Sequence, residues 1–122
     1  MQEINLRNYA YLGDAVWELF IREKTIKVTN NSKKLHQLTT SLVNTEFQYK
    51  LLEELNDFLT EEEIELCKRA RNLPIPVGRK SIQHIYRQAT AFEALIGWTY
   101  CEDKQRYNEI LGIIEPTLKE NL

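Results

Sequence analysis

The segment LGDAV, residues 12–16, places a single carboxylate, Asp14, among small and apolar residues of a helical pattern. A second segment of this kind, FEALIG at residues 92–97, does the same with Glu93. A charge on an otherwise apolar helix face must be paired, neutralised or bound to a metal, because burying it alone costs several kcal/mol. Each segment contains a glycine, which allows two helices to approach closely. We therefore expect the two helices to meet and to bring Asp14 and Glu93 to a shared cation.

In the rest of the sequence, apolar residues recur at spacings of three and four almost throughout, and no alternating run typical of a strand appears. This periodicity predicts an all-α fold. The length of 122 residues predicts a single domain spanning residues 1–122. We expect helices over residues 6–27, 35–58, 60–72, 82–100 and from 103 onward, with a break in the second region near residues 41–45.

Several polar residues stand where helices should begin. Ser32, Thr60, Ser81 and Asp103 are expected to cap the helices that follow them. Thr60 and Glu63 have the spacing of a capping box, and acids in a first turn also favour the helix dipole. We therefore interpret the acidic run at residues 61–63 as structural. Pro116 should kink or shorten the last helix.

The composition indicates in which cellular compartment the protein works. No apolar run approaches the ~18–20 residues that span a bilayer, and the first residues lack the layout of a secretory signal. The two cysteines, Cys67 and Cys101, lie inside helical patterns and do not resemble a disulfide framework. The sequence therefore predicts a cytoplasmic protein with no membrane segment.

Charge is distributed unevenly along the chain, although the net charge is only −2. Residues 53–65 carry seven acids, whereas residues 66–92 carry none and hold six cations. Lysine and arginine neutralise phosphates, which dominate nucleic-acid affinity. The acid-free stretch leads directly to Glu93, which favours phosphate binding next to the candidate site. The cations are Lys68, Arg69, Arg71, Arg79, Lys80 and Arg87.

Two carboxylates of this kind suit a hard divalent cation. Mg²⁺ takes carboxylate and water ligands and keeps waters when only one or two carboxylates bind it. Such an ion activates water for phosphodiester cleavage. Two other interpretations stay open, a buried pair of Asp14 with Arg87 and a surface pair of Glu18 with Arg22. His36 is expected to be a hydrogen-bonded or surface histidine.

These motifs resemble a known family. YLGDAVWEL at residues 11–19 resembles the signature helix of the ribonuclease III catalytic domain, and FEALIG at residues 92–97 resembles its second acidic motif. The similarity is closer to the Mini-ribonuclease III branch, which lacks a separate double-stranded-RNA-binding domain. The segments that point to this branch are YAY at residues 9–11, KLH at 34–36, RARN at 69–72 and YRQATAFE at 86–93.

The resemblance implies a homodimeric, Mg²⁺-dependent endonuclease with the all-α ribonuclease III catalytic fold. Such an enzyme cuts double-stranded RNA, each subunit cutting one strand, and leaves 5′-phosphate and 3′-hydroxyl ends. In bacteria the branch is associated with maturation of the large-subunit (23S) ribosomal RNA precursor. By this resemblance Asp14 and Glu93 are the catalytic residues and the metal ligands.

Two positions depart from the larger ribonuclease III enzymes, because Ala10 and Thr90 replace acids of the family pattern. Fewer acidic ligands imply weaker metal binding. The departures favour an alternative, a catalytically inactive ribonuclease III-like module that binds RNA or assists ribosome assembly. The retained pair of Asp14 and Glu93 disfavours it.

The expected RNA contacts lie in three parts of the sequence. The loop at residues 74–80 is basic, is flanked by prolines and leads to the helix of Glu93, so we expect it to enter a groove of the duplex. Duplex RNA is read mostly by shape and backbone, so little base specificity is expected. The candidate RNA-binding residues are Arg71, Arg79, Lys80, Lys33, Lys34 and His84.

Overall fold

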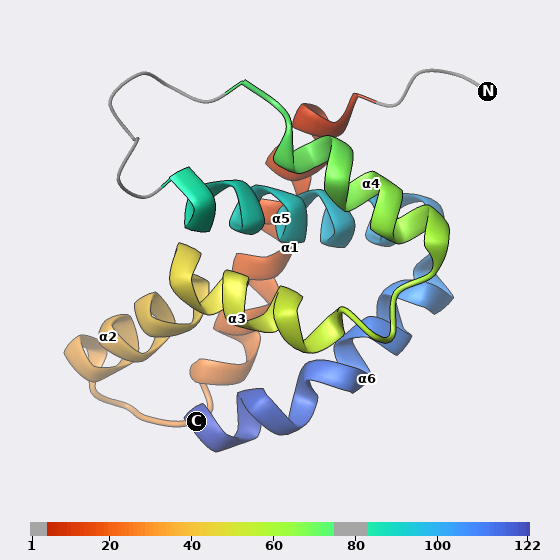
Figure 1. Cartoon of the computed structure of the whole chain (residues 1–122). Helices are drawn as coiled ribbons and strands as arrows, with labels where there is room; N and C mark the ends of the chain where they lie inside the picture. The colour runs from red at the N-terminus through yellow and green to blue at the C-terminus, as the bar shows by residue number, and fades with distance from the viewer. Residues whose placement is uncertain (1–4, 75–82) are drawn as a thin grey trace.

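The computed structural model describes residues 5–74 and 83–122, and within these ranges it contains six α-helices and no strand (Figure 1). The all-α prediction is therefore confirmed. The helices are α1 (Leu6–Thr25), α2 (Ser32–Val43), α3 (Thr45–Leu55), α4 (Glu61–Arg71), α5 (Gln83–Glu102) and α6 (Lys104–Asn121).

The helix boundaries follow the capping signals at most positions. The break in the second helical region falls at Asn44, whose side chain accepts the N–H of Phe47 at 2.9 Å and so caps α3. Thr60 and Glu63 form the expected capping box of α4. Asp103 caps α6.

One expected cap is wrong, one lies outside the described residues, and Pro116 does not shorten its helix. Asn31, not Ser32, caps α2, because the Asn31 side chain accepts the N–H of Lys34 at 2.9 Å and Ser32 is already helical. Helix α6 continues past Pro116 to Asn121. A proline there leaves only the carbonyl of Gly112 without its helical partner, and Gly112 is exposed to water. Ser81 lies outside the described residues.

Helix α5 is the centre of the bundle, and α1, α3 and α4 pack around it (Figure 1). Trp17 anchors α1 in this core: its ring meets Phe92 edge-on at 5.0 Å between centroids, and its indole N–H donates to the Leu42 carbonyl at 3.0 Å. The helix that carries Asp14 is therefore fixed against both α5 and α2.

An ion pair ties α4 to α6. Nε and Nη2 of Arg106 each donate to a different oxygen of Glu63 at 2.7 Å, and Nη2 also donates to the Phe58 carbonyl at 2.9 Å. The Arg106 pair contributes to lowering the pKa of Glu63, against the opposing effect of burial. Glu63 is thus structural, as the sequence predicted.

Both cysteines are free thiols, Cys67 buried and Cys101 exposed, which agrees with the absence of a disulfide framework. Among the described residues, none of the helices combines the length and apolar character needed to cross a membrane.

Candidate active site

Helices α1 and α5 cross at two glycines. A Cβ atom added to Gly13 would overlap the backbone carbonyl of Glu93, and one added to Gly97 would overlap the carbonyl of Tyr9. The helices can approach this closely only because neither position carries a side chain. The crossing brings the backbone of Gly13, next to Asp14, against the backbone of Glu93 itself.

The carboxyl groups of Asp14 and Glu93 meet at this crossing, as the sequence predicted. They are joined by a hydrogen bond, which requires a proton on one of them, and Glu93 is half-buried. Burial, then the bond to Asp14 and the negative charge of Asp14, raise the pKa of Glu93 to about 8. Without a cation, the pair therefore carries one proton at neutral pH.

Asp14 is more exposed than the sequence suggested. We expected an otherwise buried helix face, but Asp14 is exposed, and so are Tyr11 and Ala15 on the same side of α1. Tyr11 and Ala15 are thus apolar neighbours of Asp14 that remain exposed, whereas Gly13 and Val16 are buried. The acid therefore opens to water and to substrate, while Glu93 lies deeper.

The contacts of Arg87 and Glu18 decide whether the two alternative ion pairs form. Arg87 does not pair with Asp14, because its Nη1 donates to the carbonyls of Arg71 and Leu73 at 2.6 and 3.1 Å. Those bonds hold the end of α4 against α5. Glu18 pairs with Arg22 at 3.0 Å on the surface, as the alternative reading of Glu18 expected.

The two departures from the family pattern add no ligand. Ala10 is buried, and the Thr90 hydroxyl donates to the Tyr86 carbonyl of its own helix at 3.0 Å. Among residues 5–74 and 83–122, no three His, Cys, Asp or Glu side chains gather around one point. A cation at the Asp14–Glu93 pair would therefore take its other ligands from water or substrate.

Gln48 is a site residue that sequence reasoning missed. It lies in α3, is only 2% exposed, and its side chain is hydrogen-bonded to the carboxyl of Glu93. The signal in the sequence was a polar residue within the apolar stripe of this helix, one turn before Leu51 and Leu52.

The predicted RNA-binding residues do not form one cluster. Lys33 and Lys34 are exposed in the first turn of α2, whereas Arg71 is half-buried at the end of α4, and Figure 1 shows these helix ends well apart. His84 is exposed at the start of α5, where its Nε2 shares a hydrogen bond of 3.1 Å with the Tyr49 hydroxyl. Arg79 and Lys80, and most of the loop at residues 74–80, lie outside the described residues.

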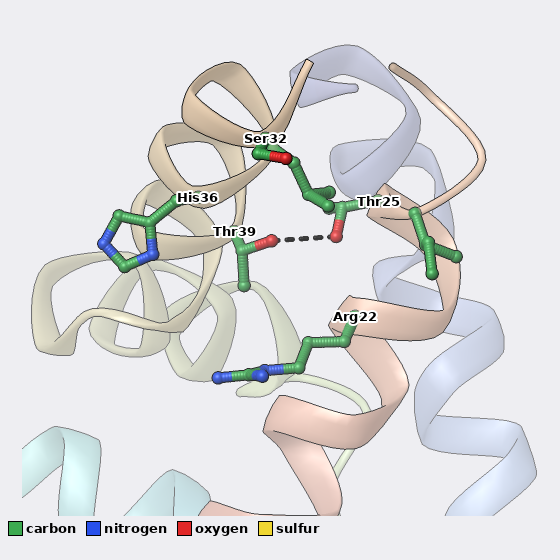
Figure 2. A pocket seen from close by; sticks show the side chains of 7 residues that line it. Arg22, Thr25, Ser32, His36 and Thr39 are labelled. Atoms are coloured by element: carbon green, nitrogen blue, oxygen red, sulfur yellow. Dashed lines mark hydrogen bonds between the residues drawn. The ribbon is translucent and has the colours of Figure 1, made fainter. Parts of the chain in front are cut away.

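A pocket of about 250 Å³ lies between the end of α1 and the start of α2, beside Lys33 and Lys34. Figure 2 shows its centre, where the hydroxyls of Thr25 and Thr39 are hydrogen-bonded at 2.8 Å across the two helices. Arg22, Ser32 and His36 also line it. His36 is exposed, as expected.

Comparison with known proteins agrees with this architecture. The family model described as the ribonuclease III domain matches residues 7–104. The Mini-ribonuclease 3 of Gloeobacter violaceus is 37% identical, over 94% of this chain and 85% of the relative. That of Clostridium tetani is also 37% identical, over 93% of this chain and 78% of the relative.

A solved structure shares the fold. The crystal structure of a protein from Fusobacterium nucleatum superposes with a TM-score of 0.85 at 32% sequence identity, covering 98% of this chain and 96% of the other. The family match includes both acidic segments, LGDAV and FEALIG, which lie within residues 7–104. The chain therefore belongs to the ribonuclease III family, in its Mini-ribonuclease 3 group, and is an endoribonuclease.

Proposed function

We propose that this endoribonuclease is Mg²⁺-dependent and cuts double-stranded RNA, with Asp14 and Glu93 as its metal ligands and catalytic residues. The observation that carries the proposal is the contact between these two carboxyls at the crossing of α1 and α5. Two like charges in contact, one of them half-buried, repel each other unless a proton or a cation lies between them. Burial of Glu93, then its hydrogen bond to Asp14 and the negative charge of Asp14, raise the pKa of Glu93 to about 8.

The residues present fit a hard divalent cation. Both groups offer oxygen ligands, one open to water and the other half-buried, and such a pair suits Mg²⁺ completed by waters and a substrate phosphate. Carboxylate oxygens are hard ligands, and no third His, Cys, Asp or Glu side chain joins the pair among the described residues. When bound, Mg²⁺ supplies a more acidic water and stabilises negative charge on the phosphate.

Asp14 and Glu93 have different tasks in this proposal. Exposed Asp14 faces the substrate and orients the attacking water, while half-buried Glu93 fixes the position of the pair. The oxygen of water bonds to phosphorus, the bond from phosphorus to the 3′ oxygen breaks, and that oxygen takes up a proton. The products are a 5′-phosphate and a 3′-hydroxyl end.

The basic side chains of four described residues are the proposed contacts to the RNA backbones. Lys33 and Lys34 on α2 stand apart from Arg71 on α4 and His84 on α5, which suits two separated phosphate strands better than one. Arg79 and Lys80 are proposed to join them from the segment that precedes α5. Phosphate contacts and recognition of the duplex shape give little base specificity.

We propose a homodimer built on the exposed face of α1. Tyr11 and Leu19 are 84% and 60% exposed, and Ala15 between them is exposed as well. These residues recur every four positions and form an apolar stripe on the helix that carries Asp14. Covering it with a second copy would place two active sites on one duplex, one for each strand.

Membership in the Mini-ribonuclease 3 group supports the proposal that the enzyme matures the precursor of the 23S ribosomal RNA, and we propose that it does so in the cytoplasm. The alternative is a catalytically inactive RNA-binding or ribosome-assembly module. Ala10 and Thr90, where the larger enzymes carry acids, favour that alternative. The Asp14–Glu93 contact favours the nuclease, because a vestigial pair of acids would gain by losing one charge.

Cleavage of a long, sequence-neutral RNA duplex tests the proposal. Wild type should cut it with Mg²⁺ and not with chelator, while Asp14→Asn and Glu93→Gln should bind the duplex but cut at least 100-fold more slowly, a loss typical of removing a catalytic group. Duplex binding by all three proteins without cutting by any would establish the inactive module instead. Cutting by wild type in chelator would contradict the metal requirement.

A further inference from the structure

Gln48 is a polar side chain in the interior of the bundle. It is 2% exposed and lies on the face of α3 that buries Phe47, Leu51 and Leu52. A buried amide is costly unless its N–H and C=O groups are hydrogen-bonded. A buried glutamine therefore needs a specific partner or a reason to be there.

The partner of Gln48 is the carboxyl of Glu93. Helix α3 packs directly on α5, and the Gln48 side chain is hydrogen-bonded to Glu93 in a way that favours the ionised carboxylate, so its N–H donates. Three helices thus meet at one point: α1 brings Asp14, α5 brings Glu93 and α3 brings Gln48.

We propose that Gln48 is a positioning residue, whose amide N–H holds the Glu93 carboxylate toward Asp14 and thereby strengthens Mg²⁺ binding at the pair. The inference rests on the proposed function and adds to it a residue outside the two acidic segments. A glutamate side chain has three rotatable bonds, so a fixed donor on one oxygen leaves the other oxygen oriented toward Asp14.

A neutral donor suits this position better than a charged one. Lysine or arginine at position 48 would neutralise Glu93 and compete with the cation for it. Glutamine stabilises the ionised form through its dipole and leaves the full negative charge available to the metal. Partners that hydrogen-bond to metal-ligating carboxylates typically change metal affinity by about 10–100-fold when they are removed.

The decisive variant is Gln48→Met, which keeps the length of the side chain and removes its hydrogen bonds. The readout is the increase in Tm as Mg²⁺ is added, which reports metal binding without turnover. We expect the Mg²⁺ concentration for half of the full Tm increase to rise about 10-fold or more, while duplex binding measured in chelator stays unchanged. The Mg²⁺ concentration for half-maximal cleavage should rise in parallel.

Thr39→Val is the matched control. It removes another buried polar bond, the one between the Thr39 and Thr25 hydroxyls, far from the acids. It should lower Tm in chelator and leave the Mg²⁺ midpoint unchanged. Gln48→Asn is the second variant, for use if Gln48→Met folds poorly. It retains an amide, but its side chain is one methylene too short to reach Glu93. It should shift the Mg²⁺ midpoint in the same direction as Gln48→Met.

Two failures are distinguishable. If wild type shows neither a Mg²⁺-dependent Tm nor cleavage, the proposed function itself is wrong. If wild type shows both, and Gln48→Met or Gln48→Asn has the wild-type Mg²⁺ midpoint, Gln48 is only a core residue and the inference is overturned. A shift of the midpoint in Thr39→Val as large as in Gln48→Met would also overturn it, because any loosening of the core would then explain the effect.

Discussion

The backbone of Gly13 lies so close to the backbone of Glu93 that a single added methyl group would overlap the Glu93 carbonyl oxygen. This contact between α1 and α5 sets the distance between the two helices and therefore the meeting of Asp14 with Glu93. The same backbone contact thus fixes both the packing of α1 on α5 and the position of the two acids.

Gly13→Ala should destabilise the protein and weaken its response to Mg²⁺. The added methyl group meets backbone atoms, which cannot move aside as a side chain does, so we expect a loss of about 3 kcal/mol, at the upper end of overpacking effects. Urea unfolding measures it. Gly112→Ala is the control, because a Cβ there meets nothing within 4 Å. It should be neutral or stabilising by up to about 1 kcal/mol, and equal losses in the two variants would contradict the close crossing.

The stability of the metal-free protein should fall as pH rises through the titration of Glu93. Its pKa is 4.5 when unperturbed and about 8 in the folded protein. Between these values the folded state binds more protons than the unfolded state, so the free energy of unfolding decreases with pH. The contribution of the Glu93 proton to the free energy of unfolding is fully present below pH 4.5 and lost above about pH 8.

Glu93→Gln isolates this effect. The difference in free energy of unfolding between wild type and Glu93→Gln, measured by urea titration in chelator from pH 5 to pH 9, should decline with pH. Mg²⁺ should bind more tightly at high pH, because the proton on the pair competes with the cation. A difference that stays flat across this range would show that the pKa of Glu93 is not raised.

Arg106→Met should destabilise the protein by about 3 kcal/mol, because removing one partner leaves the other charge buried. The side chains of Arg106 and Glu63 are only 15% and 6% exposed. Arg22→Met removes an exposed partner of Glu18 instead, and exposed pairs contribute about 0–1 kcal/mol. Thermal and urea unfolding of both variants measure these two losses of stability. The losses would be equally small if the Arg106 pair were open to water.

Leu19→Lys should convert a dimer into monomers. A charge within the exposed stripe of Tyr11, Ala15 and Leu19 cannot be buried against a second copy without a partner. Sedimentation equilibrium reports the mass directly. Ile113→Lys places the same charge on another exposed apolar residue, on α6, and should leave the dimer intact. A monomeric wild type would refute the proposed dimer surface.

Lys34→Ala should weaken duplex binding without changing its sequence preference. Each lost phosphate contact reduces the slope of log affinity against log salt by about 1. Binding of a catalytically inactive Asp14→Asn background to duplexes at several salt concentrations measures this slope. Lys119→Ala, at an exposed lysine near the end of α6, serves as the comparison, and equal slopes in both variants would remove α2 from the RNA surface.

Much of this molecule was predictable from local sequence. Helix periodicity gave the all-α class, and the polar residues Thr60 and Asp103 marked helix starts because capping depends on only three or four neighbouring residues. The two acid-bearing segments, LGDAV and FEALIG, identified Asp14 and Glu93, and their glycines indicated that the helices would meet.

Tertiary structure alone decided what surrounds those acids. Exposure depends on which helices cover a face, so Asp14 proved open to water although its neighbours are apolar. Partner choice depends on the packing of distant segments, so Arg87 bonds to carbonyls of the α4 end rather than to Asp14. Gln48 reached Glu93 only through the packing of α3 on α5. Periodicity specifies which face of a helix is apolar, but only the assembled bundle specifies what that face touches.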